Sequence, residues 1–221
     1  MFAVRPYLPK DREKIRLLCC DTGYLGNPVE KIFQDRKWFA DLNTKYYLNY
    51  EFDSCFVAES KEEIVGYVLG STNPLKYNLL FYTLIASPLF FIALFKCLTK
   101  KYDEISRAYI KRLVFRGSFE RPRRPRRSAH FHINVKDGYR KKGVGKALVQ
   151  TLFRHFLSKN VDRVYGELIH IDQLRDEILY TSHGFKIFDK KPTTLLGKES
   201  GNAYLMTVTT ELEKVRELWE L

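Results

Sequence analysis

The stretch HINVKDGYRKKGVGKAL, residues 132–148, decides the fold of this chain. It predicts a strand, a polar turn and a glycine-rich entry into an apolar helix that runs from Gly143 to about Lys159. Such a junction leaves backbone N–H groups unpaired at the positive end of the helix dipole, so it is a site for anions. Gly143 and Gly145 allow a close approach of the backbone to a phosphate, and the nearby cations are Arg140, Lys141, Lys142 and Lys146.

Three phosphate-binding patterns compete for this stretch. A Walker A loop would place its glycines at Gly138 and Gly143, but Val144 and Gly145 then stand where Lys and Ser or Thr are required. A dinucleotide-binding fingerprint would need its third small residue at position 148, which is Leu148. The pattern R-x-x-G-x-G, read from Arg140, fits the residues without a mismatch.

A second motif follows in the expected place, because residues 180–185 read YTSHGF and match Y-x-x-x-G-F. The two motifs together resemble the GNAT acetyltransferase superfamily. The stretches RPY at 5–7 and AHFHIN at 129–134 resemble the branch related to the C-terminal domain of O-GlcNAcases. The chain departs from the family pattern at Gln173 and Asp176, where the second motif usually has Asn and Ala, and at Asp137, where the turn usually has Pro.

The resemblance implies direct transfer of an acetyl group from acetyl-CoA, a co-substrate, to an amine, with no metal ion. It implies that the strand backbone pairs with the pantetheine and polarises the thioester carbonyl, that the loop holds the pyrophosphate, and that Tyr180 protonates the departing thiolate. The residues that it implies for coenzyme A binding are Ile133, Asn134, Val135, Arg140, Lys141, Lys142, Gly143, Val144, Gly145, Lys146 and Gln173.

The general base is predicted from the strand that precedes the turn. His130, His132 and Asn134 share one of its faces, whereas a central strand of an α/β sheet is normally apolar on both. These polar side chains therefore need buried partners or a cavity. We take His132 as the preferred base and Glu167 on the next strand as the second candidate, and a purely structural histidine remains the alternative.

The rest of the chain predicts an α/β (α+β) fold with a mixed central sheet, flanking helices and one domain over residues 1–221. Strands that alternate with helices after residue 129 indicate a parallel pair at the centre of the sheet. The predicted strands are 2–7, 54–59, 64–70, 129–135, 163–170, one from 185, and 204–210; the predicted helices are 11–23, 27–50, 143–159 and 172–182.

Residues 74–128 interrupt this alternation. The run Leu79–Leu98 carries one charge, Lys96, and Ser87-Pro88 is typical of a helix start, so we expect two apolar helices too short to cross a bilayer. A further helix is predicted over 101–115 and a solvated basic loop over 121–127. We expect a helical insertion that covers the acceptor side of the site. A membrane-surface or partner-binding hairpin and a true span are the alternatives.

Composition limits the class of protein. The 221 residues are 45% hydrophobic and 29% charged, which suits one large folded domain. The net charge is +12, and residues 100–127 alone hold 11 Lys and Arg against 3 acids, so the basicity is local and nucleic acid is not an expected partner. The four cysteines lack zinc spacing and the N-terminus lacks the apolar core of a signal peptide, which indicates the cytoplasm.

The sequence therefore predicts an acetyl-CoA-dependent N-acetyltransferase that acts on an unidentified small-molecule or peptide amine. Two alternatives remain, a catalytically silent domain that binds coenzyme A or a partner, and an acyltransferase associated with a membrane surface. Weak contact with anionic membranes through residues 79–127 and formation of a homodimer also remain open.

Overall fold

The computed structural model describes residues 1–172, 177–197 and 202–221. Their strands form one seven-stranded mixed sheet in the order β1-β2-β3-β4-β5-β7-β6. β4 and β5 are parallel, which confirms the predicted central pair, and the other neighbours are antiparallel. The strands are β1 (Ala3–Pro6), β2 (Cys55–Ser60), β3 (Glu63–Ser71), β4 (Ala129–Val135), β5 (Arg163–Ile171), β6 (Lys186–Pro192) and β7 (Ala203–Glu211).

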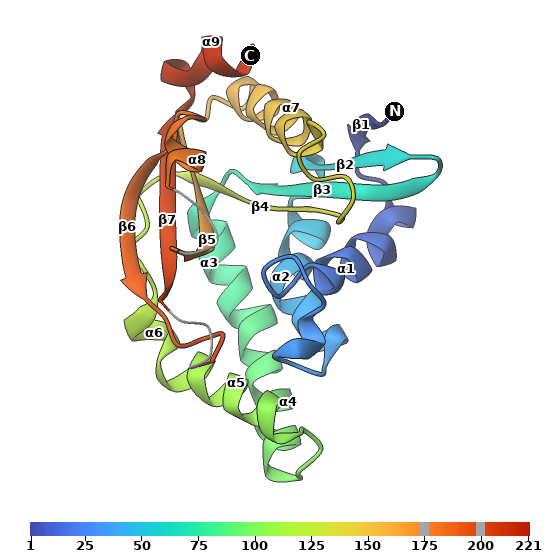
Figure 1. Ribbon diagram of the computed structural model, residues 1–221, viewed down its shortest axis with the longest axis vertical. Helices are drawn as coiled ribbons and strands as arrows, with labels where there is room; N and C mark the ends of the chain where they lie inside the picture. Colours follow the sequence, from blue (N-terminus) through green and yellow to red (C-terminus); the bar gives the residue numbers. More distant parts are fainter. Residues whose placement is uncertain (173–176, 198–201) are drawn as a thin grey trace.

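Helices cover both faces of this sheet and produce two hydrophobic cores (Figure 1). α1 (Arg12–Asp21) and α2 (Arg36–Tyr50) pack on one face, and α7 (Val144–Ser158) packs on the other. The short α8 (Ile178–Thr181) and α9 (Arg216–Trp219) lie beside the C-terminal strands. The mixed α/β class predicted from the sequence is confirmed.

Two predicted helices have different bounds in the structure. The helix predicted over 27–50 begins at Arg36, because Asp35 caps it by accepting a hydrogen bond from the Trp38 amide at 3.0 Å. Asn27 instead pairs with Tyr24 in an isolated β-bridge. Of the helix predicted over 172–182, the structure describes residues 178–181 as helical, and Gln173 and Asp176 lie outside the described residues.

The apolar part of the insertion is one continuous helix, so the predicted division at Ser87-Pro88 was wrong. α3 (Pro74–Leu80) passes through a π-helical turn, 81–86, into α4 (Ser87–Leu98). A proline in a helix lacks the N–H that bonds one turn back and crowds the carbonyl there. The wider turn directly before Pro88 accommodates this mismatch and lets the helix continue. α5 (Glu104–Phe115) and α6 (Gly117–Glu120) follow, and α5 confirms the helix predicted over 101–115.

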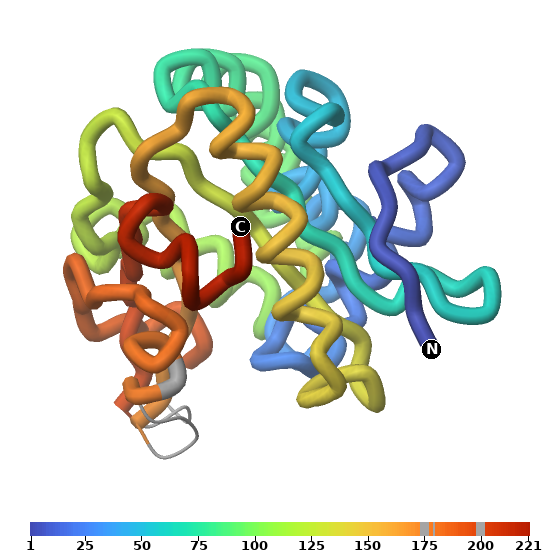
Figure 2. Tube along the Cα trace, turned by 90° about the horizontal axis from the view of Figure 1, so that it is seen from above, coloured from blue at the N-terminus to red at the C-terminus, as the bar shows by residue number. Residues whose placement is uncertain are grey.

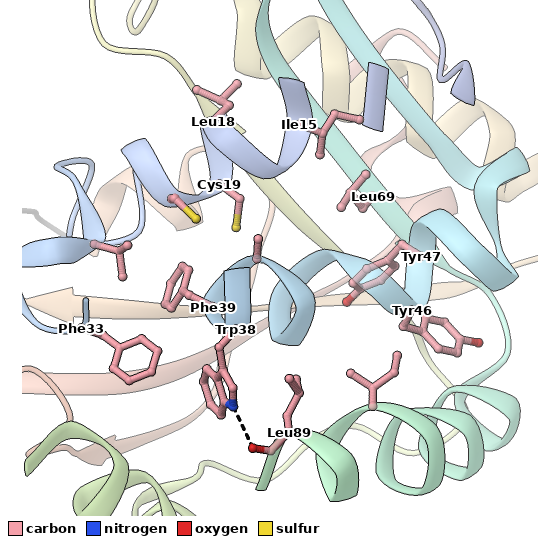
Figure 3. Packing of buried hydrophobic residues seen from close by; sticks show 14 of the residues in the cluster. Ile15, Leu18, Cys19, Phe33, Trp38, Phe39, Tyr46, Tyr47, Leu69 and Leu89 are labelled. Carbon is pink, nitrogen blue, oxygen red and sulfur yellow. Dashed lines mark hydrogen bonds between the residues drawn. The ribbon is translucent and has the colours of Figure 1, made fainter. Parts of the chain in front are cut away.

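The insertion is fixed to α2 by one buried ridge and by polar contacts. Tyr77, Ile85, Leu89 and Ala93 are buried at spacings of four and eight residues, which places them on one side of the α3–α4 helix. Trp38 donates from Nε1 to the Leu89 carbonyl oxygen at 2.8 Å (Figure 3). The Asp35 carboxylate accepts hydrogen bonds from Lys96 at 2.5 Å and from the Tyr102 hydroxyl at 2.8 Å. The helix therefore belongs to the packed domain along its length.

Candidate active site

The central strands β4 and β5 are paired over only part of their length. Residues 129–131 of β4 align with residues 164–166 of β5, and beyond that point β4 continues beside β3 while β5 continues beside β7. Figure 1 shows the result, with β2, β3 and β4 running across the view and β5, β6 and β7 running nearly at right angles to them. The sheet is split at its centre, next to the stretch that decided the fold.

The split exposes backbone groups of β4. The Lys136 amide donates to the Val65 carbonyl oxygen at 2.8 Å, so it belongs to the β3 side of the strand. Because hydrogen-bonding directions alternate along an antiparallel strand, the backbone groups of Ile133 and Val135 point away from β3 and toward the split. Arg140 Nε uses the Val135 carbonyl oxygen at 3.1 Å. The N–H and C=O of Ile133 and the N–H of Val135 are thus placed to pair with an extended ligand.

The start of α7 forms the second part of the site. Gly143 precedes the helix with a φ of 82°. Because glycine has no side chain, it cannot cap the N–H groups of the first helical turn. A Cβ added at Gly143 would meet nothing within 4 Å, and one at Gly145 would meet only Val135 Cγ2 at 3.9 Å. The space above the helix end is open, and the helix dipole makes it favourable for an anion. Lys141, Lys142 and Lys146 are exposed around it.

The guanidinium group of Arg140 positions this loop through hydrogen bonds to the backbone. Its Nε donates to the Val135 carbonyl oxygen and its Nη2 donates to the Gly26 carbonyl oxygen, both at 3.1 Å. Gly26 has a φ of 89°, and a Cβ there would lie 2.3 Å from Arg140 Nη1. The guanidinium therefore joins the turn, the end of β4 and a distant loop. Arg140 is one of the seven loop residues predicted to hold the anion. In the structure its guanidinium group instead donates hydrogen bonds to two backbone carbonyl oxygens.

A cavity of about 630 Å³ lies on the face of β4 that carries the two histidines. Its walls come from α2, the insertion helices, β4 and β5, and they are mostly aromatic and aliphatic. Phe81, Phe90, Tyr109 and Leu113 of the insertion line it, so the insertion covers this side of the sheet. The polar lining residues include His130, His132, Asn134, Arg124 and Glu167.

His130 is buried at the base of this cavity with no hydrogen-bond partner. The residue is only 6% exposed, and within the described part of the chain neither nitrogen of its ring has a hydrogen-bond partner. Its ring packs against Tyr47, Tyr77 and Tyr165, with centroids 5.7, 4.2 and 5.3 Å away. Burial, and then the positive charge of Arg124, lowers the pKa of His130 to about 3. The imidazole is therefore neutral, with a lone pair that no described residue uses.

His132 is also neutral, but its basic nitrogen is occupied. Burial lowers the pKa of His132 to about 4. Its Nε2 lies 3.0 Å from the Tyr67 hydroxyl and 3.3 Å from Asn134 Nδ2. Because an amide nitrogen can only donate, we assign Nε2 as the acceptor in this group and the proton to Nδ1.

Glu167 is bound by two guanidinium groups. Arg124 donates to it from Nε at 3.0 Å and also from Nη2, and Arg121 Nε lies 3.5 Å from the same carboxylate. Arg124 in turn lies over the Tyr165 ring, 5.9 Å from its centroid. These contacts occupy the carboxylate oxygens of Glu167 with charge-assisted hydrogen bonds.

A comparison with known families identifies the architecture. The model of the acetyltransferase (GNAT) family matches residues 27–185, well over half of the chain. The chain belongs to the GNAT acetyltransferase family. No curated protein sequence matches the chain at a significant level.

Solved structures with the same GNAT fold cover nearly the whole chain. SsHAT is 21% identical, with a TM-score of 0.65, and the match covers 96% of this chain and 98% of that one. The polyamine N-acetyltransferase of Drosophila melanogaster, described as forming N-acetylagmatine, is 14% identical, with a TM-score of 0.52 and coverages of 96% and 100%. The putative acetyltransferase yncA of Salmonella typhimurium, solved with its cofactor acetyl-CoA, is 13% identical, with a TM-score of 0.55 and coverages of 96% and 94%. At these identities the likeness shows the fold.

The second GNAT motif places Tyr180 on α8. Its hydroxyl is buried and has no hydrogen-bond partner within the described part of the chain, and its ring centroid lies 6.1 Å from that of His170. Gly184 of the same motif has a φ of 76°, and a Cβ there would lie 2.5 Å from Val215 Cγ1, so this position requires glycine. Tyr180 is thus held by a fixed turn, where it packs against the hydrophobic core on the α7 side and is not among the residues that line the cavity.

The structure brings several of the predicted residues of this GNAT chain to one cavity. His132, Asn134 and Glu167 line it, and Ile133 and Val135 point their side chains to the opposite core. The sequence missed Arg124, which binds Glu167 from 43 positions away, and Gly26, which fixes Arg140 from 114 positions away. No local pattern marks such pairs. Among residues 1–172, 177–197 and 202–221, no group of three or more His, Cys, Asp and Glu is placed to hold a metal ion.

Proposed function

We propose that this GNAT chain binds acetyl-CoA in the split between β4 and β5 and transfers its acetyl group to an amine in the adjoining cavity. The observation that carries the proposal is the divergence of the two strands after Phe131, directly beside the uncapped start of α7. The first feature fits an extended amide chain and the second fits a pyrophosphate. The acetyl-CoA bound to the neighbour yncA supports the same assignment.

Each part of the site has a distinct role in the proposal. The backbone of Ile133 and Val135 pairs with the pantetheine arm and orients the thioester. The N–H groups that follow Gly143 bind the pyrophosphate, with Lys141, Lys142 and Lys146 adding charge, and Arg140 fixes the loop. Acetyl-CoA supplies an acetyl group as a thioester, from which the coenzyme A thiolate is a good leaving group.

Proton transfers are assigned to side chains on either side of the reacting atoms. Tyr180 is the proposed acid, since its phenol O–H can donate a proton to the departing thiolate. For the base, His130 is better placed than His132, because its nitrogens are unpaired whereas Nε2 of His132 already accepts from Tyr67. Variants His130→Gln and His132→Gln separate the two, since loss of the base lowers kcat with little change in acetyl-CoA affinity.

The cavity supports an acceptor with one amine and an apolar body. The two glutamates in its lining are already bound, Glu167 by Arg121 and Arg124, and Glu120 by Thr193 and Thr194. A polyamine would bring further ammonium groups toward these arginines without a free carboxylate among the described lining residues. An arylalkylamine would instead bury its ring among the aromatic walls.

The experiment combines binding with turnover. We expect isothermal titration to detect acetyl-CoA, and release of free thiol to be faster with 2-phenylethylamine than with spermidine. Binding without turnover on any amine would favour the silent coenzyme A-binding domain. No binding of acetyl-CoA to folded protein would refute the proposal. Relation to the O-GlcNAcase branch remains a prediction from residues 5–7 and 129–134.

A further inference from the structure

One side of the insertion is a broad apolar surface that none of the described helices and strands covers. The helix Pro74–Leu98 is long and apolar enough to cross a membrane. Only 17% of its apolar 18-residue window is buried within the protein, so most of these apolar residues are exposed. Figure 2 shows this helix at the margin of the molecule. We call the following exposed side chains the apolar face: Leu75, Leu79, Tyr82, Leu84, Phe90, Phe91, Ile92, Leu94, Phe95 and Leu98. Soluble proteins seldom leave so many large apolar side chains together in water.

Two hydroxyl groups on the exposed side of the helix are bonded to the helix itself. Thr83 donates from its hydroxyl to the Leu79 carbonyl oxygen at 2.6 Å, and Ser87 donates to the Tyr82 carbonyl oxygen at 2.7 Å. No charged residue occurs from 77 to 95. In water these hydroxyl groups could bond to solvent instead. In lipid, a hydroxyl group without a hydrogen-bond partner has a high free-energy cost. The face is therefore suited to an apolar medium.

Positive charge surrounds the apolar face. Residues 74–127 hold thirteen Lys and Arg against three Asp and Glu, a net +10 out of the chain's +12. At the C-terminal end of the helix, Lys101 Nζ lies 5.3 Å from the centroid of the Phe95 ring. In the middle, Arg121 Nη1 donates to the Tyr82 hydroxyl at 2.8 Å. Basic groups thus contact the apolar side chains directly, which is the arrangement that binds anionic lipid headgroups.

The packing of the helix decides how it meets a bilayer. Its buried ridge lies against α2, the Trp38–Leu89 hydrogen bond ties it at mid-length, and Lys96 is paired with Asp35. A helix that spans the bilayer would have to leave these contacts or carry the domain into the lipid. A helix that lies in the membrane plane keeps them and buries only its free side.

We propose that the apolar face docks on the surface of a bilayer that contains anionic lipids, with α3 and α4 parallel to the membrane plane. A second copy of the chain is a less suitable occupant, because it would bring together two copies of a strongly basic segment, residues 74–127, which carries a net charge of +10. Phe81 and Phe90 of the same helix line the cavity, so docking places the cavity next to the lipid. The proposal concerns the surface alone and does not depend on acetyl transfer.

Vesicle co-sedimentation of the full chain tests the proposal. We expect binding to vesicles of phosphatidylcholine with phosphatidylserine, weak binding to phosphatidylcholine alone, and loss of binding at high salt. The double variant F91S/F95S should weaken binding about tenfold or more, since each substitution removes a large exposed ring that docking would bury in the lipid. Its control is F52S, which changes a side chain 59% exposed outside the insertion and should bind as the wild type does.

A charge-reversal pair makes the test independent of the aromatic side chains. K100E/K101E should weaken binding to anionic vesicles about tenfold or more, whereas K10E/K61E, with the same change of net charge away from the insertion, should have a small effect. Circular dichroism confirms that each variant is folded.

Three outcomes would overturn the proposal. The first is no binding to either kind of vesicle. The second is binding that F91S/F95S and K100E/K101E leave unchanged. The third is a dimer in light scattering that F91S/F95S dissociates while vesicle binding is absent, which would make a second copy the occupant.

Discussion

The two glycines of R-x-x-G-x-G should respond in opposite ways to alanine. Gly143 has a φ of 82°, a conformation that costs an L-residue about 1–2 kcal/mol. Gly145 lies within α7 without such a φ, and a Cβ there meets only Val135 at 3.9 Å. Replacing a helical glycine by alanine contributes up to about 1 kcal/mol. For a chain of this size each kcal/mol shifts Tm by about 2–4 °C, so Gly143→Ala should lower Tm and Gly145→Ala should raise it.

A charge at Gly145 should separate stability from binding. Gly145→Asp places a carboxylate at the positive end of the helix dipole, which keeps or raises stability. The same carboxylate stands where the pyrophosphate is proposed to bind. Two unit charges 4 Å apart repel by about 4 kcal/mol at an effective dielectric constant of 20, which corresponds to about 10³-fold in affinity. We expect acetyl-CoA affinity to fall at least about 100-fold while Tm is unchanged or higher.

Thermal melts with and without acetyl-CoA, together with isothermal titration, measure both effects. The matched control is Gly145→Asn, which has nearly the same shape without the charge and should lose much less affinity. Wild-type affinity in Gly145→Asp would refute the placement of the pyrophosphate at α7. A higher Tm for Gly143→Ala would refute the argument from its backbone conformation.

Three further predictions concern other parts of the site. Tyr180→Phe should lower kcat about 10²-fold with acetyl-CoA affinity unchanged, and a kcat within twofold of wild type would exclude Tyr180 as the acid. Burial lowers the pKa of His130 to about 3 and of His132 to about 4 from about 6.5 in the unfolded chain, so the unfolded state binds more protons between these values. Stability should therefore be full above about pH 6.5 and fall as pH drops toward 4, and urea titrations should show a shallower fall in His130→Phe. Gly26→Ala should displace the Arg140 guanidinium group and weaken acetyl-CoA binding. The control is Gly138→Ala, because its Cβ would meet nothing within 4 Å and only its φ of 81° disfavours alanine. In the same titration, Gly138→Ala should bind acetyl-CoA more tightly than Gly26→Ala.

The sequence by itself determined the parts of the site that are local in the chain. Residues 132–148 specify a strand, a turn and a helix start, because turn glycines and apolar periodicity act over a few neighbouring residues. The same holds for the turn at Gly184, whose positive φ needs glycine. From these segments the mixed α/β fold and the GNAT family could be predicted.

The tertiary structure alone decided what depends on residues far apart in the chain. The point at which β4 leaves β5, the unpaired ring of His130, and the Arg124–Glu167 and Arg140–Gly26 contacts all join segments separated by tens of residues. Pro88 gave a local signal for a helix start, and the π-helical turn before it together with packing on α2 overrode that signal. Local propensity is worth at most a few kcal/mol at one proline, whereas burial of a whole helix ridge adds many contacts, so packing prevails where the two disagree.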